Sequence, residues 1–418
     1  MKILFYNHTG QVSGAERLLL MILARIDRDE FAPIVVCPDQ DSLSGLVSEL
    51  GVPVETIGAL KARFTWRVDH LARYCKSFFQ VMRQLRLSVR TIKPDLIHAN
   101  SIRAGLVATT ATIGLRTPII WHLHDMLPRH PLSTLIRLTA LLSLRSRMIA
   151  VSQAVAANFC GRFPRSMMNR VGVILNAIDI DRFQPPQTKS QTKRRAICNE
   201  LQLREADYLI GIVGQVTPRK GQLELLRAFR QALPEMPDGV LLIIGAPLFN
   251  RDHEYLEALE HTAMDLGISE RVRMVGPRTD IESIMQALDL LIVNSKIEAF
   301  GLVILEAMAS GTPVLAAAVD GIPEIIAHDE NGWLVPPRDE RALAEAIVNL
   351  RHRPELGARL AKQGREHVVA RFSMDRYLTE LQAFYRSHAD RKGPVFEEPT
   401  SRQAADAEFR LSFPNTRT

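Results

Sequence analysis

Cysteine is scarce in this chain, and the cysteines that occur stand far apart: Cys37, Cys75, Cys160 and Cys198. No two of them form a C-x-x-C pair, so the sequence predicts neither a disulfide framework nor a thiolate metal site. Such sparse cysteine usage is typical of proteins from reducing compartments, and the cytoplasm is the expected location.

Long apolar runs are also missing. No window reaches the roughly 18 consecutive apolar residues that a membrane-spanning helix needs. Arg137, Arg145 and Arg147 interrupt the most apolar stretch. The N-terminus is apolar only as far as Tyr6, which is too short for a signal peptide and typical of a buried first strand. We therefore expect no transmembrane helix, and any membrane contact to be peripheral.

Acidic residues are sparse in the first half of the chain, where Lys and Arg outnumber Asp and Glu. No nucleic-acid-binding motif accompanies this excess, so nucleic acid is not an expected partner. The stretch 129–147 is basic, apolar and free of acidic residues. It leaves two interpretations open: a helix on an anionic membrane surface, or a core-packing helix with a basic solvent face.

What the chain does contain is a regular alternation of short apolar runs with helical stretches. Its 418 residues are 46% hydrophobic and 23% charged, as in ordinary globular proteins of two or three domains. Such alternation predicts parallel sheets covered on both faces. The expected strands are residues 2–6, 33–37, 95–98, 118–122, 147–151 and 172–175, then 208–213, 240–244, 271–275, 289–293, 313–316 and 333–335.

The alternation breaks at Pro185–Arg195, a polar and basic segment. We therefore expect an α/β protein with two Rossmann-like, doubly wound parallel-sheet domains facing a cleft, with ligands at the carboxyl ends of the strands. The predicted ranges are 1–183 for the first domain, 184–206 for a linker, 207–371 for the second domain, 372–388 for a last helix and 389–418 for a disordered polar tail.

Glu298 and Glu306 lie on either side of a point where a helix is expected to begin. Residues 310–313, Ser-Gly-Thr-Pro, are expected to end that helix. If its first turn forms near Phe300 and Gly301, free N–H groups and the positive end of the dipole lie beside Glu298. This arrangement suits a phosphorylated sugar, because the dipole attracts phosphate and the carboxylates accept hydrogen bonds from hydroxyls.

A longer run, residues 293–316, is followed by related segments at 321–326 and 331–336. In the first half, Ser13–Arg17 follows the first strand, and in the second half Gly214–Gly221 forms a glycine-containing basic segment. Together these segments resemble glycosyltransferase family 4, the retaining group 1 glycosyltransferases of the GT-B fold. In that resemblance Ser13–Arg17 is the glycine loop, and Gly214–Gly221 is the phosphate-binding segment. By the same resemblance, the last helix crosses back to the first domain.

The resemblance implies an activity and its partners. The donor would be a nucleotide sugar, and UDP-sugars and GDP-mannose are the leading candidates. The acceptor would be a lipid-linked or polysaccharide-type glycan or glycolipid. Transfer would retain the anomeric configuration by front-face displacement. No cofactor and no metal are expected, because Lys220 and helix N-termini supply positive charge. Asp179–Asp181 is an Asp-x-Asp sequence, but its place before the linker is typical of a helix or turn cap.

The resemblance also implies site residues. His124 follows the strand 118–122 and is expected near the transferred sugar, ahead of His122 on the same strand face. Asn100 and Arg103 are expected at the cleft rim, with no assigned role. The implied catalytic residues are Lys220, Glu298 and His124, and the implied donor-binding residues are Gly14, Gln215, Arg219, Phe300, Gly301, Leu302, Val303 and Glu306.

Gln215 departs from the family pattern, which has Arg at this position. A neutral amide cannot supply the missing charge, so weaker phosphate binding or another source of charge is expected. Arg219 precedes Lys220, and the sequence leaves open whether its side chain reaches the site.

Two functions from other classes also fit parts of the sequence. A sugar-nucleotide epimerase shares the two-domain architecture, but it needs no open acceptor surface, and the segment from Glu298 to Glu306 argues against it. A nucleotide-sugar-binding protein without catalysis would suit Gln215. Transfer or hydrolysis of a nucleotide sugar separates these alternatives from a transferase.

Overall fold

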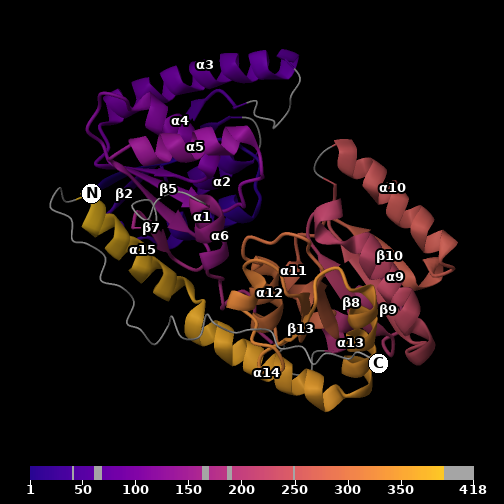
Figure 1. The fold of residues 1–418 in the computed structure, drawn as a ribbon. Helices are drawn as coiled ribbons and strands as arrows, with labels where there is room; N and C mark the ends of the chain where they lie inside the picture. Colours follow the sequence, from indigo (N-terminus) through magenta and orange to yellow (C-terminus); the bar gives the residue numbers. More distant parts are fainter. Residues whose placement is uncertain (40–41, 61–67, 162–168, 186–190, 248–249, 390–418) are drawn as a thin grey trace.

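The computed structural model describes residues 1–39, 42–60, 68–161, 169–185, 191–247 and 250–389. Two parallel sheets form in this part of the chain, one in each half (Figure 1). In each sheet the strand order reverses once near the middle, which is the doubly wound arrangement. The predicted α/β class with two Rossmann-like domains is therefore confirmed.

The first domain contains a seven-stranded sheet in the order β3-β2-β1-β4-β5-β6-β7. Helices α3 to α6 share a hydrophobic core on one face, and α1 and α2 cover the other. The strands are β1 (Lys2–Tyr6), β2 (Ala32–Pro38), β3 (Val54–Ile57), β4 (Leu96–Ala99), β5 (Ile119–Leu123), β6 (Ser146–Ala150) and β7 (Val171–Val173). The helices are α1 (Gly14–Arg25), α2 (Leu43–Glu49), α3 (Val68–Ile92), α4 (Ile102–Ala111), α5 (Pro131–Leu142) and α6 (Gln153–Cys160).

The second domain contains a six-stranded sheet in the order β10-β9-β8-β11-β12-β13. Its strands are β8 (Tyr208–Val213), β9 (Gly239–Ile244), β10 (Val272–Gly276), β11 (Leu290–Val293), β12 (Val314–Ala317) and β13 (Trp333–Val335). Its α-helices are α8 (Gln191–Glu200), α9 (Gln222–Ala232), α10 (Asn250–Asp265), α11 (Ile281–Ala287), α12 (Leu302–Ala309) and α13 (Glu340–His352). Short 3₁₀ turns are η1 (Pro218–Lys220), η2 (Leu233–Glu235), η3 (Ser269–Arg271) and η4 (Ile322–Glu324).

Every strand expected from the apolar runs is present, with small shifts at the ends. Strand β3 was not predicted, because this edge strand has only a short apolar run and contains Glu55 and Thr56. Its partner β2 is largely buried, whereas β3 is buried at Ile57 alone.

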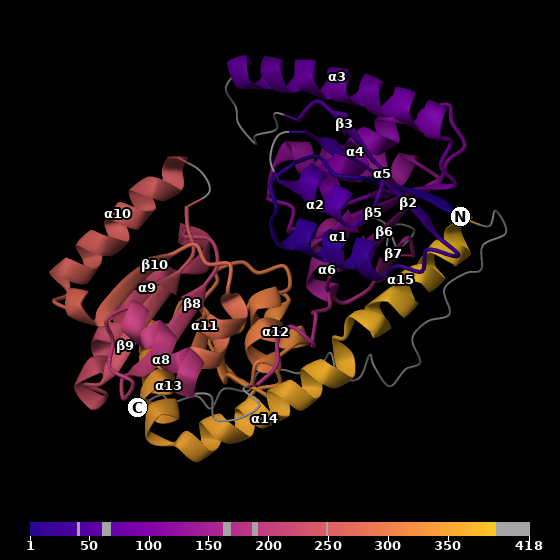
Figure 2. The same cartoon turned by 180° about the vertical axis from the view of Figure 1, so that it is seen from behind.

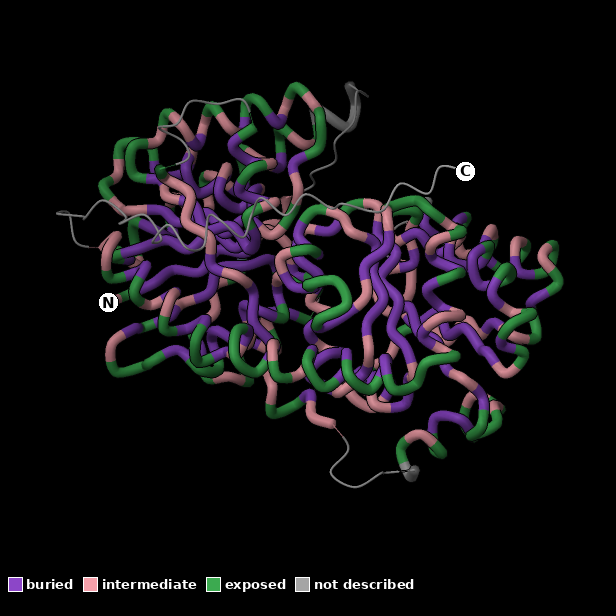
Figure 3. The backbone as a smooth tube through the Cα atoms, turned by 60° about the horizontal axis from the view of Figure 1, so that its bottom comes forward, coloured by how far each residue is buried: buried purple, intermediate pink, exposed green. Residues whose placement is uncertain are grey.

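Buried residues concentrate in the strands of both sheets (Figure 3). Trp121 on β5 is fully buried, and its indole N–H donates to Thr109 on α4 at 3.0 Å. A Cβ added at Gly105 would lie 2.1 Å from the Trp121 ring, so α4 can approach β5 only because this residue has no side chain. Replacing Trp121 by Ala would cost about 3–5 kcal/mol of stability.

Helix α15 (Met374–Ala389), the last described element, returns to the first domain (Figures 1 and 2). It follows α14 (Pro354–Arg371) and packs in the core that contains α1 and α2. The hydroxyl of Tyr385 lies 2.7 Å from Nδ1 of His98 on β4, and Arg386 forms two hydrogen bonds to Glu30. Of the tail predicted at 389–418, only Ala389 belongs to the described residues.

The predicted linker, 184–206, contains α8, which packs against α11 of the second domain. Residues 186–190 of this range lie outside the described part of the chain. None of the described helices has both the length and the apolar character needed to span a membrane.

Candidate active site

Each sheet has one point where the strand order reverses, between β1 and β4 in the first domain and between β8 and β11 in the second. Ligands of doubly wound domains bind outside the carboxyl ends of the strands at such points. Asn7 and Asn100 follow the two strands at the first point, and Gly214 and Asn294 follow those at the second. The predicted site residues lie around these two points.

Helix α12 begins where the sequence predicted. Gly301 precedes its first residue with φ +106°, a left-handed conformation that favours glycine, and accepts a hydrogen bond from the N–H of Ile304. The amides of Leu302 and Val303 form the first turn, where N–H groups have no partner inside the helix. Phe300 is buried against Phe372, so its side chain anchors the loop.

Lys220 and Glu298 form a close ion pair beside this helix end. Nζ of Lys220 lies 2.6 Å from Oε2 of Glu298, and both side chains are largely buried, with 14% and 10% exposed. The Ser295 hydroxyl donates to the same carboxylate at 2.8 Å. Burial alone would raise the pKa of Glu298. The charge and hydrogen bond of Lys220, the Ser295 hydroxyl and the charge of Arg219 outweigh burial, so the pKa lies below its ordinary value.

Gln215 does not take part in this pair. Its amide Nε2 donates to Asp252 on α10 at 2.7 Å. Arg219 is exposed, yet its charge acts on Glu298. The charge of Arg219 therefore adds to that of Lys220 at Glu298, and its role in donor binding stays a prediction.

Glu306 projects from the second turn of α12 and is half-buried. Burial raises its pKa above the ordinary value, and the Glu282 carboxylate adds to this effect. The charges of Arg17 and Arg182 offset the rise only in part. Since Arg17 belongs to the first-domain glycine loop, that domain acts electrostatically on the acid predicted to bind the donor.

The glycine loop also lies against α12. A Cβ added at Gly14 would lie 3.5 Å from Cδ1 of Leu302. This places the first residue of α1 at ordinary contact distance from the first residue of α12. The predicted donor residues of the two domains thus meet at this junction.

His124 lies at the carboxyl end of β5 and is half-buried, whereas His122 inside the strand is fully buried. Nε2 of His124 lies 3.2 Å from Oδ1 of Asn100, and its ring stands 3.9 Å from the ring of His122. Burial lowers the pKa of His124 to about 3, so the imidazole is neutral at physiological pH. The structure therefore keeps His124, ahead of His122, as the site candidate.

The prediction that Asn100 lies at the cleft rim is wrong. Asn100 is fully buried, and its amide is hydrogen-bonded to Asn7 and faces His124. Arg103 is half-buried in the first turn of α4, and its charge acts on His8. Burial first, and Arg103 second, lower the pKa of His8 to about 3.

Both halves of the chain match known families. Residues 12–182 match the family described as Glycosyltransferase Family 4, and residues 193–367 match Glycosyl transferases group 1. The chain belongs to glycosyltransferase family 4. The expectation from the sequence segments is confirmed.

This family 4 chain is similar to two bacterial proteins named D-inositol 3-phosphate glycosyltransferase. The one from Saccharomonospora viridis is 30% identical over 316 residues, which cover 70% of this chain and 70% of the relative. The one from Salinispora tropica is 29% identical over 308 residues, 70% of this chain and 63% of the relative. The chain thus spans less than two thirds of the length of the Salinispora protein.

A crystal structure of Anabaena HepE in complex with UDP and glucose has a similar fold. It is 28% identical in sequence, has a TM-score of 0.78, and the match covers 93% of this chain and 100% of that one. HepE was also crystallised with UDP-glucose.

The candidate site also contains residues that were not predicted from the sequence. Glu298 donates its own N–H to Asp320, and Ser295 binds its carboxylate. Ser295 precedes Glu298 by three residues, a local signal that was available. Asn7 and Glu16 connect to Asn100, and the position of Asn7 directly after β1 was a second available signal.

The two domains of this family 4 chain are hydrogen-bonded to each other near the site. Glu324 on η4 accepts hydrogen bonds from the N–H groups of Gln153 and Ala154, both at 2.8 Å. The neighbouring Ser152 hydroxyl donates to the carbonyl of Ala299 at 2.7 Å. A second-domain carboxylate therefore caps the first turn of α6, just beyond the loop that carries Glu298.

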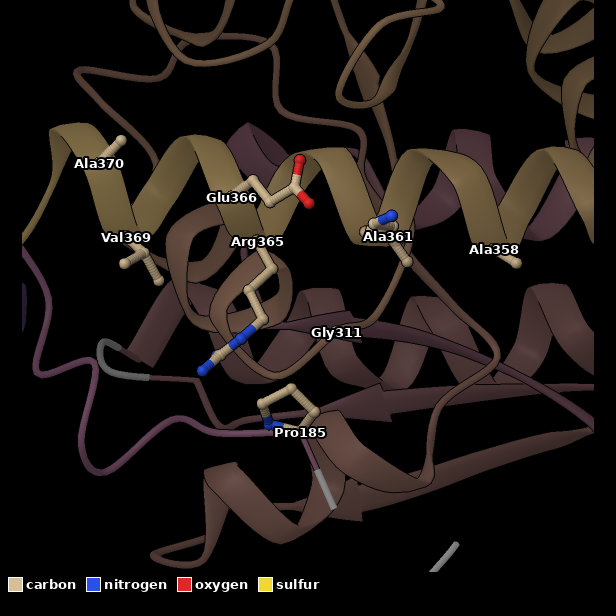
Figure 4. A pocket seen from close by; sticks show the side chains of 9 residues that line it. Pro185, Gly311, Ala358, Ala361, Arg365, Glu366, Val369 and Ala370 are labelled. Carbon is tan, nitrogen blue, oxygen red and sulfur yellow. The ribbon is translucent and has the colours of Figure 1, made fainter. Parts of the chain in front are cut away.

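A groove runs along α14, between Ala358 and Ala370, and reaches Pro185 and Gly311 (Figure 4). Arg365 crosses it to donate to the carbonyl of Ala309, the last residue of α12. The groove therefore adjoins the opposite end of α12 from Glu298, and it contains none of the predicted site residues.

Proposed function

We propose that this chain is a retaining glycosyltransferase that moves a hexose from a nucleotide sugar to a lipid-linked or polysaccharide-type acceptor. The observation that carries the proposal is the pair of Lys220 and Glu298 beside the N-terminus of α12, at the switch point of the second sheet. A diphosphate and a sugar are the two parts of a donor that such a cation and such an acid can bind.

The roles divide by chemistry. Lys220, Arg219 and the first amides of α12 would bind the diphosphate. Glu298 would accept hydrogen bonds from the transferred sugar, and Glu306 from the ribose. His124 would contact the C6 hydroxyl of the sugar from the first domain. In this proposal positive side chains and helix ends supply the charge that neutralises the leaving group.

The reaction would proceed on one face of the sugar. The bond from the anomeric carbon to the phosphate oxygen breaks, and the bond to the acceptor oxygen forms on the same side. The acceptor's hydroxyl proton passes to the departing phosphate. The protein's task is electrostatic stabilisation of the leaving group, with the two domains excluding water.

The donor proposal starts from UDP-sugars, because HepE binds UDP and UDP-glucose. GDP-mannose is the next candidate. Lys220, Arg219 and the two acids are assigned to the phosphates, the sugar and the ribose, which are common to both nucleotides, so a screen has to include both.

The acceptor proposal rests on the outer face of the first domain. Exposed large apolar side chains gather on or just after α3, α4 and α5. They are Phe79, Leu87, Ile113, Leu135, Leu138, Leu142 and Leu144. Helix α5 packs into the core through Ser133, Ile136 and Ala140, and Arg129 and Arg145 are exposed, as the core-packing alternative for 129–147 expects. The exposed leucines of the same stretch are the observation that supports membrane contact. An apolar outer face favours an acceptor presented at a membrane.

A second acceptor class follows from the relatives. Their names specify D-inositol 3-phosphate, a soluble phosphorylated polyol. The same nucleotide-sugar site would serve either acceptor, so the two differ only at the first domain.

The test begins with a thermal-shift screen of UDP-sugars and GDP-mannose, since a ligand of the native state raises its melting temperature. The stabilising donor is then incubated with inositol 3-phosphate or with lipid-linked acceptors, and the product's anomeric configuration is read by NMR. Lys220→Ala serves as the inactive control. Binding without hydrolysis or transfer would instead favour the non-catalytic alternative, and an epimerised nucleotide sugar the epimerase.

A further inference from the structure

A chain of buried amides connects the glycine loop to His124. Asn7 and Asn100 are fully buried, and Glu16 on α1 is nearly so. Nδ2 of Asn7 donates to the carbonyl of Thr9 at 2.6 Å and to Oε1 of Glu16 at 3.1 Å. Because both partners are acceptors, this atom of Asn7 must be the nitrogen, and its oxygen faces the other way.

The same logic fixes Asn100. Its Nδ2 lies 3.0 Å from Oδ1 of Asn7 and 3.4 Å from the carbonyl of Ala15. Both are acceptors, so this atom is again the nitrogen. The remaining Oδ1 of Asn100 faces Nε2 of His124 at 3.2 Å. A carbonyl oxygen can only accept, so Nε2 of the neutral imidazole must carry the proton.

Glu16 holds the start of this chain in place. Its second carboxylate oxygen accepts a hydrogen bond from the N–H of Ser13, in the glycine loop. The hydrogen-bonded chain therefore runs from Ser13 through Glu16, Asn7 and Asn100 to His124. In every link a donor faces an acceptor. The opposite tautomer would place a lone pair of His124 against the oxygen of Asn100. Because a buried acceptor is then left unpaired, the population of this tautomer should be lower by roughly tenfold or more.

We propose that Asn7, Asn100 and Glu16 are positioning residues that hold His124 in the Nε2–H tautomer and present its Nδ1 lone pair to a hydroxyl of the transferred sugar. Among the described residues, no hydrogen bond joins Nδ1 of His124 to another group. The inference rests on the proposed function, in which His124 contacts that sugar. It gives a role to Asn100, for which the sequence suggested none.

A second buried chain behind the histidines provides a matched control. Tyr385 binds Nδ1 of His98, and Nε2 of His98 lies 3.2 Å from Nδ1 of His122. This chain meets His124 through a ring contact, with no hydrogen bond to it. Tyr385→Phe therefore removes a buried polar group from the same domain and leaves the amide chain intact.

The test reads the tautomer directly. Long-range proton–nitrogen NMR spectra of the full chain, labelled with ¹⁵N-histidine, distinguish the protonated from the unprotonated ring nitrogen, and His124→Ala assigns the signals. We expect Nδ1 of His124 to be unprotonated in the wild type and in Tyr385→Phe. Asn100→Ala should produce Nδ1–H or a mixture of tautomers. Asn100→Asp should restore the wild-type tautomer with a lower stability, because a carboxylate still accepts from Nε2–H but cannot donate to Asn7 and Ala15.

Transfer kinetics complete the test. Asn100→Ala should lower kcat by about tenfold, the effect of one misdirected hydrogen bond, and should leave the affinity for free nucleoside diphosphate unchanged. A wild-type tautomer in Asn100→Ala, with the fold intact by thermal unfolding, overturns the inference whatever the activities are. Full activity of His124→Ala would instead overturn the proposed sugar contact, while the spectra would still report the tautomer, so the two failures are distinguishable.

Discussion

Nζ of Lys220 lies 2.6 Å from Oε2 of Glu298, so the cation proposed to bind the donor phosphates is neutralised by the acid proposed to bind the sugar. The two residues are 78 positions apart and come from different loops of the second sheet. A donor would give each of them a new partner, phosphate for the lysine and hydroxyls for the carboxylate.

Lys220→Ala is expected to lower kcat by about 10²-fold or more, because the lost cation faces the charge that grows on the leaving group. The matched control is Lys296→Ala, which removes a lysine whose 2.7 Å ion pair is with Glu224 on α9. Sugar transfer with saturating donor is the measurement, and thermal unfolding checks the fold of both variants. Near wild-type turnover in Lys220→Ala would rule out its role.

The two acids are expected to separate in a binding experiment. Glu306→Gln should weaken binding of free UDP, because it removes a charge-assisted bond to the ribose, whereas Glu298→Gln should mainly affect the sugar-bearing donor. Calorimetry with UDP and with UDP-glucose measures both effects. An equal loss of UDP affinity in the two variants would contradict the division.

Binding of UDP is expected to weaken as the pH falls, through the titration of Glu306. Its pKa is raised, chiefly by burial, so the carboxylate that accepts from ribose is lost at a higher pH than an exposed Glu would be. Free UDP also titrates, but it does so equally with every variant. The difference between wild type and Glu306→Gln, measured by calorimetry across the acidic range, should therefore isolate this carboxyl. Parallel pH curves would refute the prediction.

The same raised pKa has a consequence for stability. A carboxyl with a folded pKa above its unfolded value stabilises the fold when protonated, and this contribution is lost as the pH rises through the folded pKa. Above its folded pKa the ionised Glu306 therefore opposes folding. Glu306→Gln should raise the unfolding midpoint of the donor-free protein while weakening UDP binding, and a lowered midpoint would argue against a raised pKa.

Local patterns in the sequence were enough to predict most of the fold. Strand positions follow from apolar runs, and the start of α12 follows from Gly301 and the residues around it. The edge strand β3 was missed because edge strands need little apolar surface. Its neighbour β2, with a long buried run, was found at once.

Contacts between distant residues could not be predicted in this way. The position of Asn100 beside His124 was not evident, because both follow strands whose order in the sheet only the fold reveals. The same holds for Tyr385 and His98, which are 287 positions apart. The partner of Gln215 could not be predicted either. The sequence shows that a positive charge is missing at this position, but only the structure shows that the amide donates to Asp252.

Glu324→Ala is expected to weaken the contact between the domains. The variant loses two charge-assisted hydrogen bonds to the first turn of α6, together worth about 1–3 kcal/mol. Urea unfolding should show this loss, and transfer should be slower if the domains no longer close on the donor. Glu345→Ala is the control, since its pair with Arg341 is exposed and worth little. Equal stability of the two variants would refute the prediction.

The outer face of the first domain combines apolar and basic side chains. On α3, Lys76, Phe79, Arg83, Leu87 and Arg90 are all exposed, and their spacing of three and four residues places them on one side of the helix. Each basic residue near an anionic surface contributes about 1 kcal/mol, and burial of each exposed apolar side chain adds to that.

We therefore expect the protein to bind vesicles that contain anionic lipid, with less binding at high salt and little to zwitterionic vesicles. The double change Leu142→Gln and Leu144→Gln should reduce co-sedimentation about tenfold or more, because these side chains are 78% and 84% exposed and would enter the lipid interface. Met264→Gln changes an exposed apolar residue of the second domain and should bind like the wild type. Binding that ignores lipid charge and salt, or that survives the double change, would leave the soluble phosphorylated polyol as the better acceptor class.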